Sequence, residues 1–174
     1  PSGRIYVAER DNNRVSVFER NGTFVRSFGS EFDKPEGVTV SPQGEVYVAD
    51  TNNHRIQVFD LNGSFRRTFG EQGDLDGRFN RPKGLAFNTT RELLVAEHGN
   101  SRIQALDANG TFLWKKTLPN SWAWTPKGIS LSPDGLILIG ARGRLTILDN
   151  RGETIQVIER LHGGPFNQYD DEAF

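Results

Sequence analysis

Residues 44–59 read GEVYVADTNNHRIQVF, and near copies of this stretch occur three more times. The copies read GRIYVAERDNNRVSVF at residues 3–18, RELLVAEHGNSRIQAL at residues 91–106 and, in a more divergent form, GLILIGARGRLTIL at residues 135–148. Four equivalent arginines are separated by 41, 47 and 42 residues: Arg14, Arg55, Arg102 and Arg144. A period in the forties is typical of repeat architectures. Such proteins act mainly through extended surfaces, so we expect a binding surface rather than a single catalytic pocket.

The second repeat predicts four short strands. They cover residues 37–40, 46–49, 55–59 and 65–69, and a polar loop at residues 50–54 joins the second strand to the third. The first two strands are mostly apolar, which indicates burial near an axis, whereas the fourth is charged and alternating, as on an outer edge. The pair Asn62-Gly63 before the fourth strand predicts a type I′ hairpin turn. A four-stranded sheet repeated at this period is the blade of a β-propeller, whereas the coils of a β-solenoid are much shorter.

We therefore predict an all-β β-propeller made of four-stranded antiparallel blades, as one segment over residues 1–174. The blades are expected at residues 3–30, 35–70, 82–118 and 126–159, with residues 160–174 as the entry to a further blade. The first repeat begins at a second strand, and the tail resembles the blade entry at residues 73–79. We expect the ring to continue beyond both ends of the chain, and a closed four-bladed ring is the alternative.

The pattern at residues 35–59, P-x-G-V-x-V-x-x-x-G-x-V-Y-V-A-D-T-N-N-H-R-I-Q-V-F, closely resembles an NHL repeat, and the resemblance extends over residues 3–158. It implies a ring of usually six blades, of which about four are present here. NHL propellers often form part of TRIM-type ubiquitin ligases, where they select RNA or protein targets. Some NHL-like propellers are metal-dependent lyases or hydrolases. The fourth copy departs from the pattern, because Arg142-Gly143 replaces the Asn-rich loop, which puts a surface role of that loop in doubt.

Composition argues against several classes of function. The formal net charge is −1, so any basic surface is local, and we expect neither binding to a DNA duplex nor insertion into a membrane. The chain has no cysteine, so it holds neither a disulfide nor the thiolate zinc site of a RING or B-box domain. The three histidines, His54, His98 and His162, occupy different positions within their repeats. We therefore expect no metal, no cofactor and no catalytic residue in this chain.

The loops between second and third strands leave a propeller on the same face as the segments that link blades. This upper face is expected to carry basic, amide and aromatic side chains: His54, Arg78, Arg81, Lys83, Trp122, Trp124, Lys127, Arg142, Asn53 and Asn100. Cations and amides of this kind contact phosphates and base edges. One of the two tryptophans is expected to fill the core position of Phe32 and Phe79, and the other to be an exposed anchor for a partner. We predict a non-catalytic platform for protein partners or single-stranded RNA.

Residues that recur at one position in every blade have a structural role more often than a binding role. Arg14, Arg55 and Arg102 are expected to pair with the carboxylates Asp50 and Glu97 and their equivalent in the first blade. Asn and Asp in such loops also close turns through their own backbone. The function is therefore expected where the copies differ.

Four N-x-S/T sequons begin at Asn21, Asn62, Asn88 and Asn109, and three of them lie in the same hairpin of their blades. The geometry of that turn also favours Asn-Gly, so we expect a cytoplasmic protein, with secretion as the alternative. Two other functions remain open. One is an extracellular propeller in adhesion or signalling, and the other is part of a metal-dependent lyase or hydrolase with its ligands in other blades.

Overall fold

The computed structural model describes residues 3–29, 31–118, 125–141 and 143–159, which form four antiparallel sheets. The first sheet contains β1 (Ile5–Glu9), β2 (Arg14–Phe18) and β3 (Phe24–Phe28), and the second contains β4 (Pro35–Val40), β5 (Glu45–Asp50), β6 (Arg55–Asp60) and β7 (Phe65–Phe69). The third contains β8 (Pro82–Phe87), β9 (Leu93–Glu97), β10 (Arg102–Leu106) and β11 (Phe112–Thr117). The fourth contains β12 (Gly128–Leu131), β13 (Ile137–Ala141), β14 (Arg144–Leu148) and β15 (Thr154–Glu159). A single 3₁₀ turn, η1 (Thr51–Asn53), is the one helical element among the described residues.

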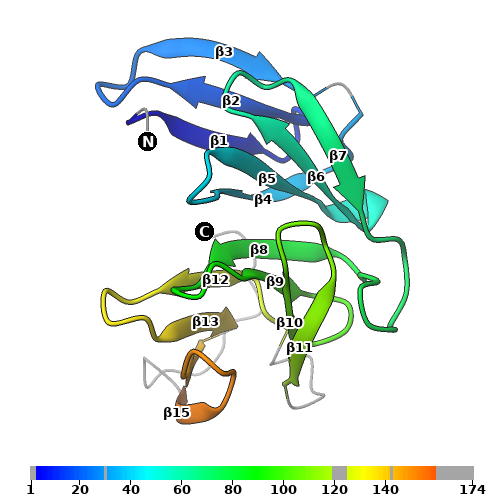
Figure 1. The fold of residues 1–174 in the computed structure, drawn as a ribbon, viewed down its shortest axis with the longest axis vertical. Helices are drawn as coiled ribbons and strands as arrows, with labels where there is room; N and C mark the ends of the chain where they lie inside the picture. The colour runs from blue at the N-terminus through cyan, green and yellow to red at the C-terminus, as the bar shows by residue number, and fades with distance from the viewer. Residues whose placement is uncertain (1–2, 30, 119–124, 142, 160–174) are drawn as a thin grey trace, which may run out of the picture.

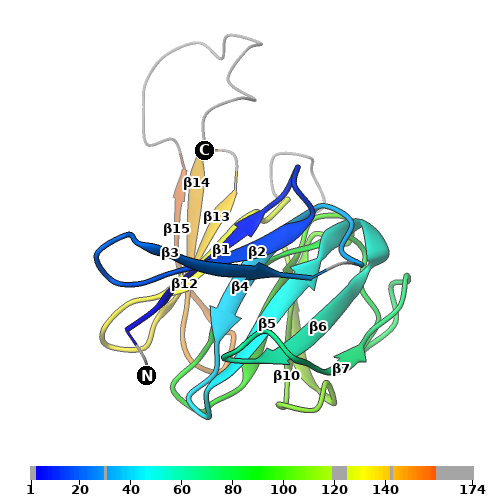
Figure 2. The same cartoon turned by 90° about the horizontal axis from the view of Figure 1, so that it is seen from above.

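The prediction of propeller blades is confirmed, since every sheet keeps its strands in sequence order with antiparallel neighbours. We number the sheets as blades one to four along the chain, and Figures 1 and 2 show them arranged around an arc. The first strands of successive sheets pack against one another, β1 against β4, β4 against β8 and β8 against β12. The inner strand of blade two begins at Pro35, two residues earlier than predicted, because a bulge between Pro35 and Gly37 extends the pairing with β5.

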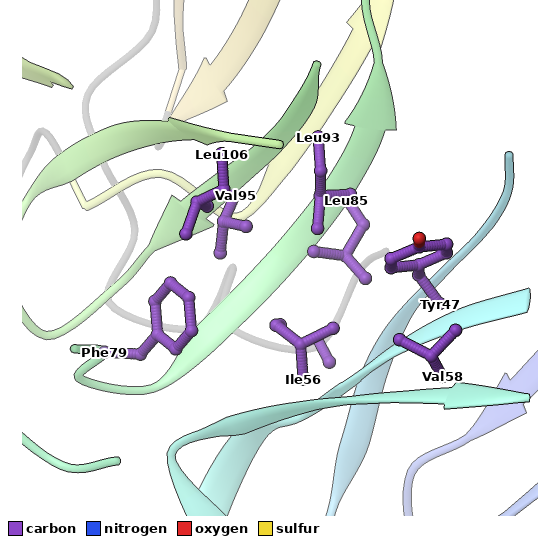
Figure 3. Packing of buried hydrophobic residues seen from close by; sticks show 9 residues of the cluster. Tyr47, Ile56, Val58, Phe79, Leu85, Leu93, Val95 and Leu106 are labelled. Atoms are coloured by element: carbon purple, nitrogen blue, oxygen red, sulfur yellow. The ribbon is translucent and has the colours of Figure 1, made fainter. Parts of the chain in front are cut away.

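The core lies between the blades rather than within one of them. Successive side chains of a strand point to opposite faces of its sheet, so a blade that lies between two others is apolar on both faces. In β5, Val46 and Val48 pack toward blade one, whereas Tyr47 and Ala49 pack toward blade three. Figure 3 shows the second of these layers, in which Tyr47, Ile56 and Val58 face side chains of blade three. Burial on both faces explains why the second strands of blades two and three, β5 and β9, are mostly apolar.

The hairpin turn between β6 and β7 corrects one prediction. Gly63 has a positive φ of 85°, but Asn62 does not, whereas a type I′ turn requires a positive φ at both residues. The Gly63 N–H donates to the Asp60 carbonyl at 3.0 Å, and the Asp60 N–H donates to the Ser64 carbonyl at 2.9 Å. The pairing of β6 with β7 shifts register between Val58 and Phe59. This is the longer hairpin loop with a glycine bulge, so the prediction of a type I′ turn is wrong.

Candidate functional site

The upper face of the propeller is held together by buried carboxylates at the ends of the second strands. In blade two the Asp50 carboxylate accepts hydrogen bonds from Asn53 Nδ2, Arg55 Nε and Gln57 Nε2, at 2.9, 2.8 and 2.8 Å from its Oδ2. Its Oδ1 accepts the backbone N–H of Asp33 at 2.8 Å. Since Asp33 belongs to the segment entering blade two, the carboxylate fixes the link between blades one and two.

Blade three repeats this arrangement around Glu97. The carboxylate accepts hydrogen bonds from the Asn80 backbone, Asn100 Nδ2, Arg102 Nε and Gln104 Nε2, at 3.0, 2.7, 2.5 and 2.7 Å. The Arg102 guanidinium also donates hydrogen bonds to three carbonyl oxygens of the linker between β7 and β8, those of Asp74, Leu75 and Arg78. The signature arginine therefore clamps the linker that enters its own blade, rather than facing a ligand.

Blade one has the same network in a more exposed form. Glu9 accepts hydrogen bonds from Asn12 Nδ2 and Arg14 Nε at 2.5 and 3.0 Å and from Ser16 Oγ, where blades two and three have glutamine. The hydroxyl of Ser16, followed by Asn12 and Arg14, lowers the pKa of Glu9 to about 2. The amide nitrogens of Asn53 and Asn100, two of the predicted binding residues, are likewise committed to these internal networks. We assign both asparagines to the fold.

His54 lies on the upper face, and its side chain accepts a hydrogen bond from the backbone. Its Nδ1 accepts the Arg81 backbone N–H at 3.1 Å, so the ring joins blade two to the segment entering blade three. Asn13 makes the equivalent contact in blade one, where its Oδ1 accepts the Lys34 N–H at 2.9 Å. All four residues have a positive φ, between 50° and 55°. His54 and Asn13 thus accept equivalent backbone hydrogen bonds with different side chains.

Charged side chains gather where the inner strands begin, around His98. Glu36, Lys83 and Lys127 occupy the same place in three repeats, between the proline and glycine of P-x-G. Adjacent inner strands bring these positions close together, because a Cβ on Gly37 would lie 1.9 Å from the Lys83 carbonyl oxygen. A Cβ on Gly84 would lie 3.0 Å from the Lys127 carbonyl oxygen. We call Glu36, Arg81, Lys83, His98 and Lys127 the axial cluster.

The electrostatics of the axial cluster are dominated by positive charge. Burial, followed by the charges of Lys83, Arg81 and Lys127, lowers the pKa of His98, and Glu36 partly offsets this effect. Lys83 Nζ lies 2.9 Å from Glu36 Oε2, and both side chains are mostly buried. Arg81 and Lys127 are exposed, and neither has an ion-pair partner among the residues that the structure describes. The cluster therefore presents two available cations beside a neutralised pair.

The remaining predicted residues are placed apart from this cluster or outside the described chain. Arg78 lies in the linker between β7 and β8, with its guanidinium 3.0 Å from Glu71 Oε1. Trp122, Trp124 and Arg142 lie outside the described residues, as does His162, so the expected core and surface roles of the two tryptophans stay predictions. Sequence reasoning missed Glu36 and His98 as members of the site. The repeated P-x-G position was the available signal for Glu36.

Neither a metal-binding group nor a membrane-spanning helix is found among the residues that the structure describes. No group of three or more histidine, cysteine or carboxylate side chains is placed to hold a metal ion in this part of the chain. Over the same residues, none of the helical structure has the length and apolar character needed to cross a membrane.

Comparisons with known proteins agree with this architecture. The NHL repeat family model matches residues 32–59 and 79–106, and a search of curated protein sequences finds no significant match. A streptogramin B lyase structure is similar with a TM-score of 0.72 at 19% identity, covering 90% of this chain and 51% of that one. A catalytically inactive virginiamycin B lyase from Staphylococcus aureus, determined with quinupristin, has a TM-score of 0.71 at 17% identity, with coverages of 90% and 52%. A protein of unknown function from Bacteroides caccae has a TM-score of 0.68 at 16% identity, with coverages of 90% and 57%.

These structural likenesses show a shared fold and not a shared activity, since sequence identity is below one fifth in each case. The chain spans about half the length of the solved structures that it matches. The matched repeats at residues 32–59 and 79–106 contribute, respectively, most of blades two and three. The ordered antiparallel sheets and the similar solved structures show that the chain has a β-propeller fold, and two of its blades contain NHL repeats.

Proposed function

We propose that this chain is a binding platform whose axial cluster binds an acidic segment of a partner protein. The observation that carries the proposal is the pair of exposed cations, Arg81 and Lys127, beside the half-buried imidazole of His98. Cations that are already paired gain little from a ligand, whereas exposed unpaired cations attract a partner's carboxylates and raise its association rate. Selection of a protein target is also a role that the resemblance to NHL repeats implies, because NHL propellers often form part of TRIM-type ubiquitin ligases.

An acidic protein segment fits the cluster better than single-stranded RNA for two reasons. Proteins that bind single strands gain much of their affinity from aromatic rings on which bases stack. The exposed aromatic rings in the described part of the chain, Phe24 and Phe65, begin β3 and β7 at the opposite ends of the sheets. The carboxylate of Glu36 would also repel a phosphate backbone, while a peptide of mixed charge has cations to offer it.

The test compares two double charge reversals on opposite faces. Arg81→Glu with Lys127→Glu reverses the available cations of the axial cluster. Arg20→Glu with Arg151→Glu is the matched control, because both arginines are exposed in turns at the far ends of the strands. The probes are a fluorescent glutamate-rich peptide that also contains lysines and a fluorescent oligouridylate, each titrated by anisotropy at low and high salt.

We expect the peptide to bind the unchanged chain and the cluster variant to bind it about tenfold more weakly or worse, with the control unchanged. Equal losses in both variants would overturn the proposal, because they would show a nonspecific charge effect. Tighter binding of the oligouridylate, lost in the cluster variant and falling steeply with salt, would replace the protein partner with RNA. No binding of either probe would also overturn it.

A further inference from the structure

Three hairpin turns at the lower face, the face opposite the upper face, carry the tripeptide Asn-Gly-Thr or Asn-Gly-Ser. The turns are residues 19–23, 60–64 and 107–111, and they place Asn21, Asn62 and Asn109 in exposed positions. Each turn follows a strand that begins with a signature arginine at the upper face. Strands of five or six residues separate the two faces by roughly 17–20 Å.

The fourth turn of the same kind shows that the fold does not require this tripeptide. At residues 149–153, Arg151 and Glu153 stand where the other turns have Asn and Thr or Ser. Their backbone N–H groups donate to Asp149 Oδ1 at 2.8 and 2.9 Å, and Asn62 and Ser64 donate to Asp60 Oδ1 at the same two distances. Only the glycine is demanded in all four turns, where its φ lies between 82° and 91°. Turn geometry therefore does not require the recurrence of Asn and of the hydroxyl residue.

The amide groups of the three asparagines remain available at the surface. In two of the turns, the carboxylates of Asp60 and Asp107 accept the backbone N–H groups of Asn62 and Asn109. The side chains of these two asparagines take no part in these bonds. Asn21 Oδ1 accepts the Thr23 N–H at 3.0 Å, which leaves its Nδ2 outside that bond. None of the three Nδ2 atoms has a hydrogen-bond partner among the described residues.

Asn88 begins the fourth sequon, and its environment is the opposite. Asn88 is only 4% exposed. Its Nδ2 donates to Glu92 Oε2 at 2.7 Å, and its Oδ1 accepts the Glu92 N–H at 2.8 Å and the Thr90 hydroxyl at 2.9 Å. The Ser41 and Ser132 hydroxyls accept the equivalent backbone N–H groups in blades two and four. Asn88 is thus a buried turn-closing residue, like those serines.

We propose that Asn21, Asn62 and Asn109 are acceptors of N-linked glycans and that Asn88 is not. The donor is a lipid-linked oligosaccharide diphosphate. The asparagine Nδ2 forms a bond to the anomeric carbon as the bond from that carbon to the diphosphate oxygen breaks. The lipid diphosphate leaves with the bonding electrons, and the amide proton passes to a base of the transferase. The glycans lie on the lower face and leave the axial cluster open to a partner.

The test produces the chain through the secretory pathway of a eukaryotic cell and maps its glycans by mass spectrometry. Enzymatic removal of each glycan converts its asparagine to aspartate, which marks the site. We expect marks at Asn21, Asn62 and Asn109, an unmarked Asn88, and loss of all glycans in the triple Asn→Gln variant.

The matched control is Thr90→Ala, which destroys the Asn88 sequon but keeps the asparagine. It should leave the number of glycans unchanged. A glycan on Asn88, or an unmodified asparagine in any of the three turns of the folded and secreted chain, would overturn the proposal. The same map of protein isolated from its natural source must show the same three sites, and bare asparagines there would overturn it too.

Discussion

Arg102 Nε lies 2.5 Å from Glu97 Oε1, and the two side chains are only 5% and 0% exposed. The equivalent pair in blade one, Arg14 and Glu9, is separated by 3.0 Å, with side chains 46% and 21% exposed. The same sequence signature therefore produces a buried ion pair in one blade and a solvated pair in another. Removing one member of a buried pair leaves an uncompensated charge in the interior, whereas water replaces the partner of a solvated pair.

Arg102→Met is therefore expected to lower the free energy of unfolding by about 3–5 kcal/mol, because Glu97 stays buried without its cation. Arg14→Met is the matched control and should have a far smaller effect. Urea denaturation followed by tryptophan fluorescence measures both. Similar losses in the two variants would show that burial does not distinguish these pairs.

The glycines of the three P-x-G entries predict a graded series of effects. A Cβ on Gly37 would lie 1.9 Å from the Lys83 carbonyl oxygen, and one on Gly84 would lie 2.9 Å from the Ile129 nitrogen. A Cβ on Gly128 would meet nothing within 4 Å among the described residues. None of the three has a positive φ, so space and not backbone conformation separates them.

We expect Gly37→Ala to cost about 1–3 kcal/mol or more, since the contact is with backbone that cannot move aside without shifting a strand. Gly84→Ala should cost less, and Gly128→Ala should be close to neutral. Midpoints of thermal unfolding give the ranking. A destabilised Gly128→Ala with a tolerated Gly37→Ala would contradict the arrangement of inner strands described here.

The repeat period and the apolar second strands were sufficient to predict the blades, because both follow from local sequence. The carboxylate partners of the signature arginines were also predictable, since Asp50 and Arg55 flank one loop. The turn at Asn62-Gly63 was mispredicted because the two hairpin types share a glycine and differ in the φ of the residue before it. Sequence alone does not decide that difference.

The axial cluster was only partly predictable. Lys83 and Lys127 stood out as positions that differ between blades, but the ion pair with Glu36 arises only when β4 and β8 lie side by side. His98 belongs to the axial cluster only because of the same packing, since the charged residues around it come from three blades. Contacts between repeats depend on how the sheets stack, and the sequence of one repeat does not contain that information.

The His98 imidazole reports directly on the charges of the axial cluster. Burial is the largest cause of its lowered pKa, and the neighbouring cations lower that pKa further. Lys127→Gln and Arg81→Gln should each raise the pKa of His98 toward the ordinary value of 6.5, and Glu36→Gln should lower it further. Titration of the His98 ring by NMR measures these shifts, with Arg20→Gln as a distant control. An unchanged His98 pKa in the Lys127 and Arg81 variants would remove the electrostatic basis of the cluster.

Acid should destabilise the chain through carboxylates that the fold holds ionised. Glu9 is the clearest case, since its pKa falls from 4.5 to about 2 in the folded chain. The pKa values of Glu45, Asp60 and Asp149 are also lowered, by hydrogen bonds from Arg67, from the Ser64 backbone and from the Glu153 backbone, respectively. A lowered folded-state pKa means that the unfolded chain takes up protons first as the pH falls.

The stabilisation from Glu9 is therefore complete above pH 4.5 and is lost as the pH falls toward about 2. Ser16→Ala removes the hydrogen bond that lowers the Glu9 pKa most, so it should raise that pKa and reduce the slope of stability against pH in this window. Urea unfolding across the window, together with the carboxyl carbon shift of Glu9 by NMR, separates this effect from a general loss of packing at Ser16. A Ser16→Ala chain that is less stable by the same amount at every pH, with an unmoved Glu9 titration, would show that the hydroxyl acts by packing alone.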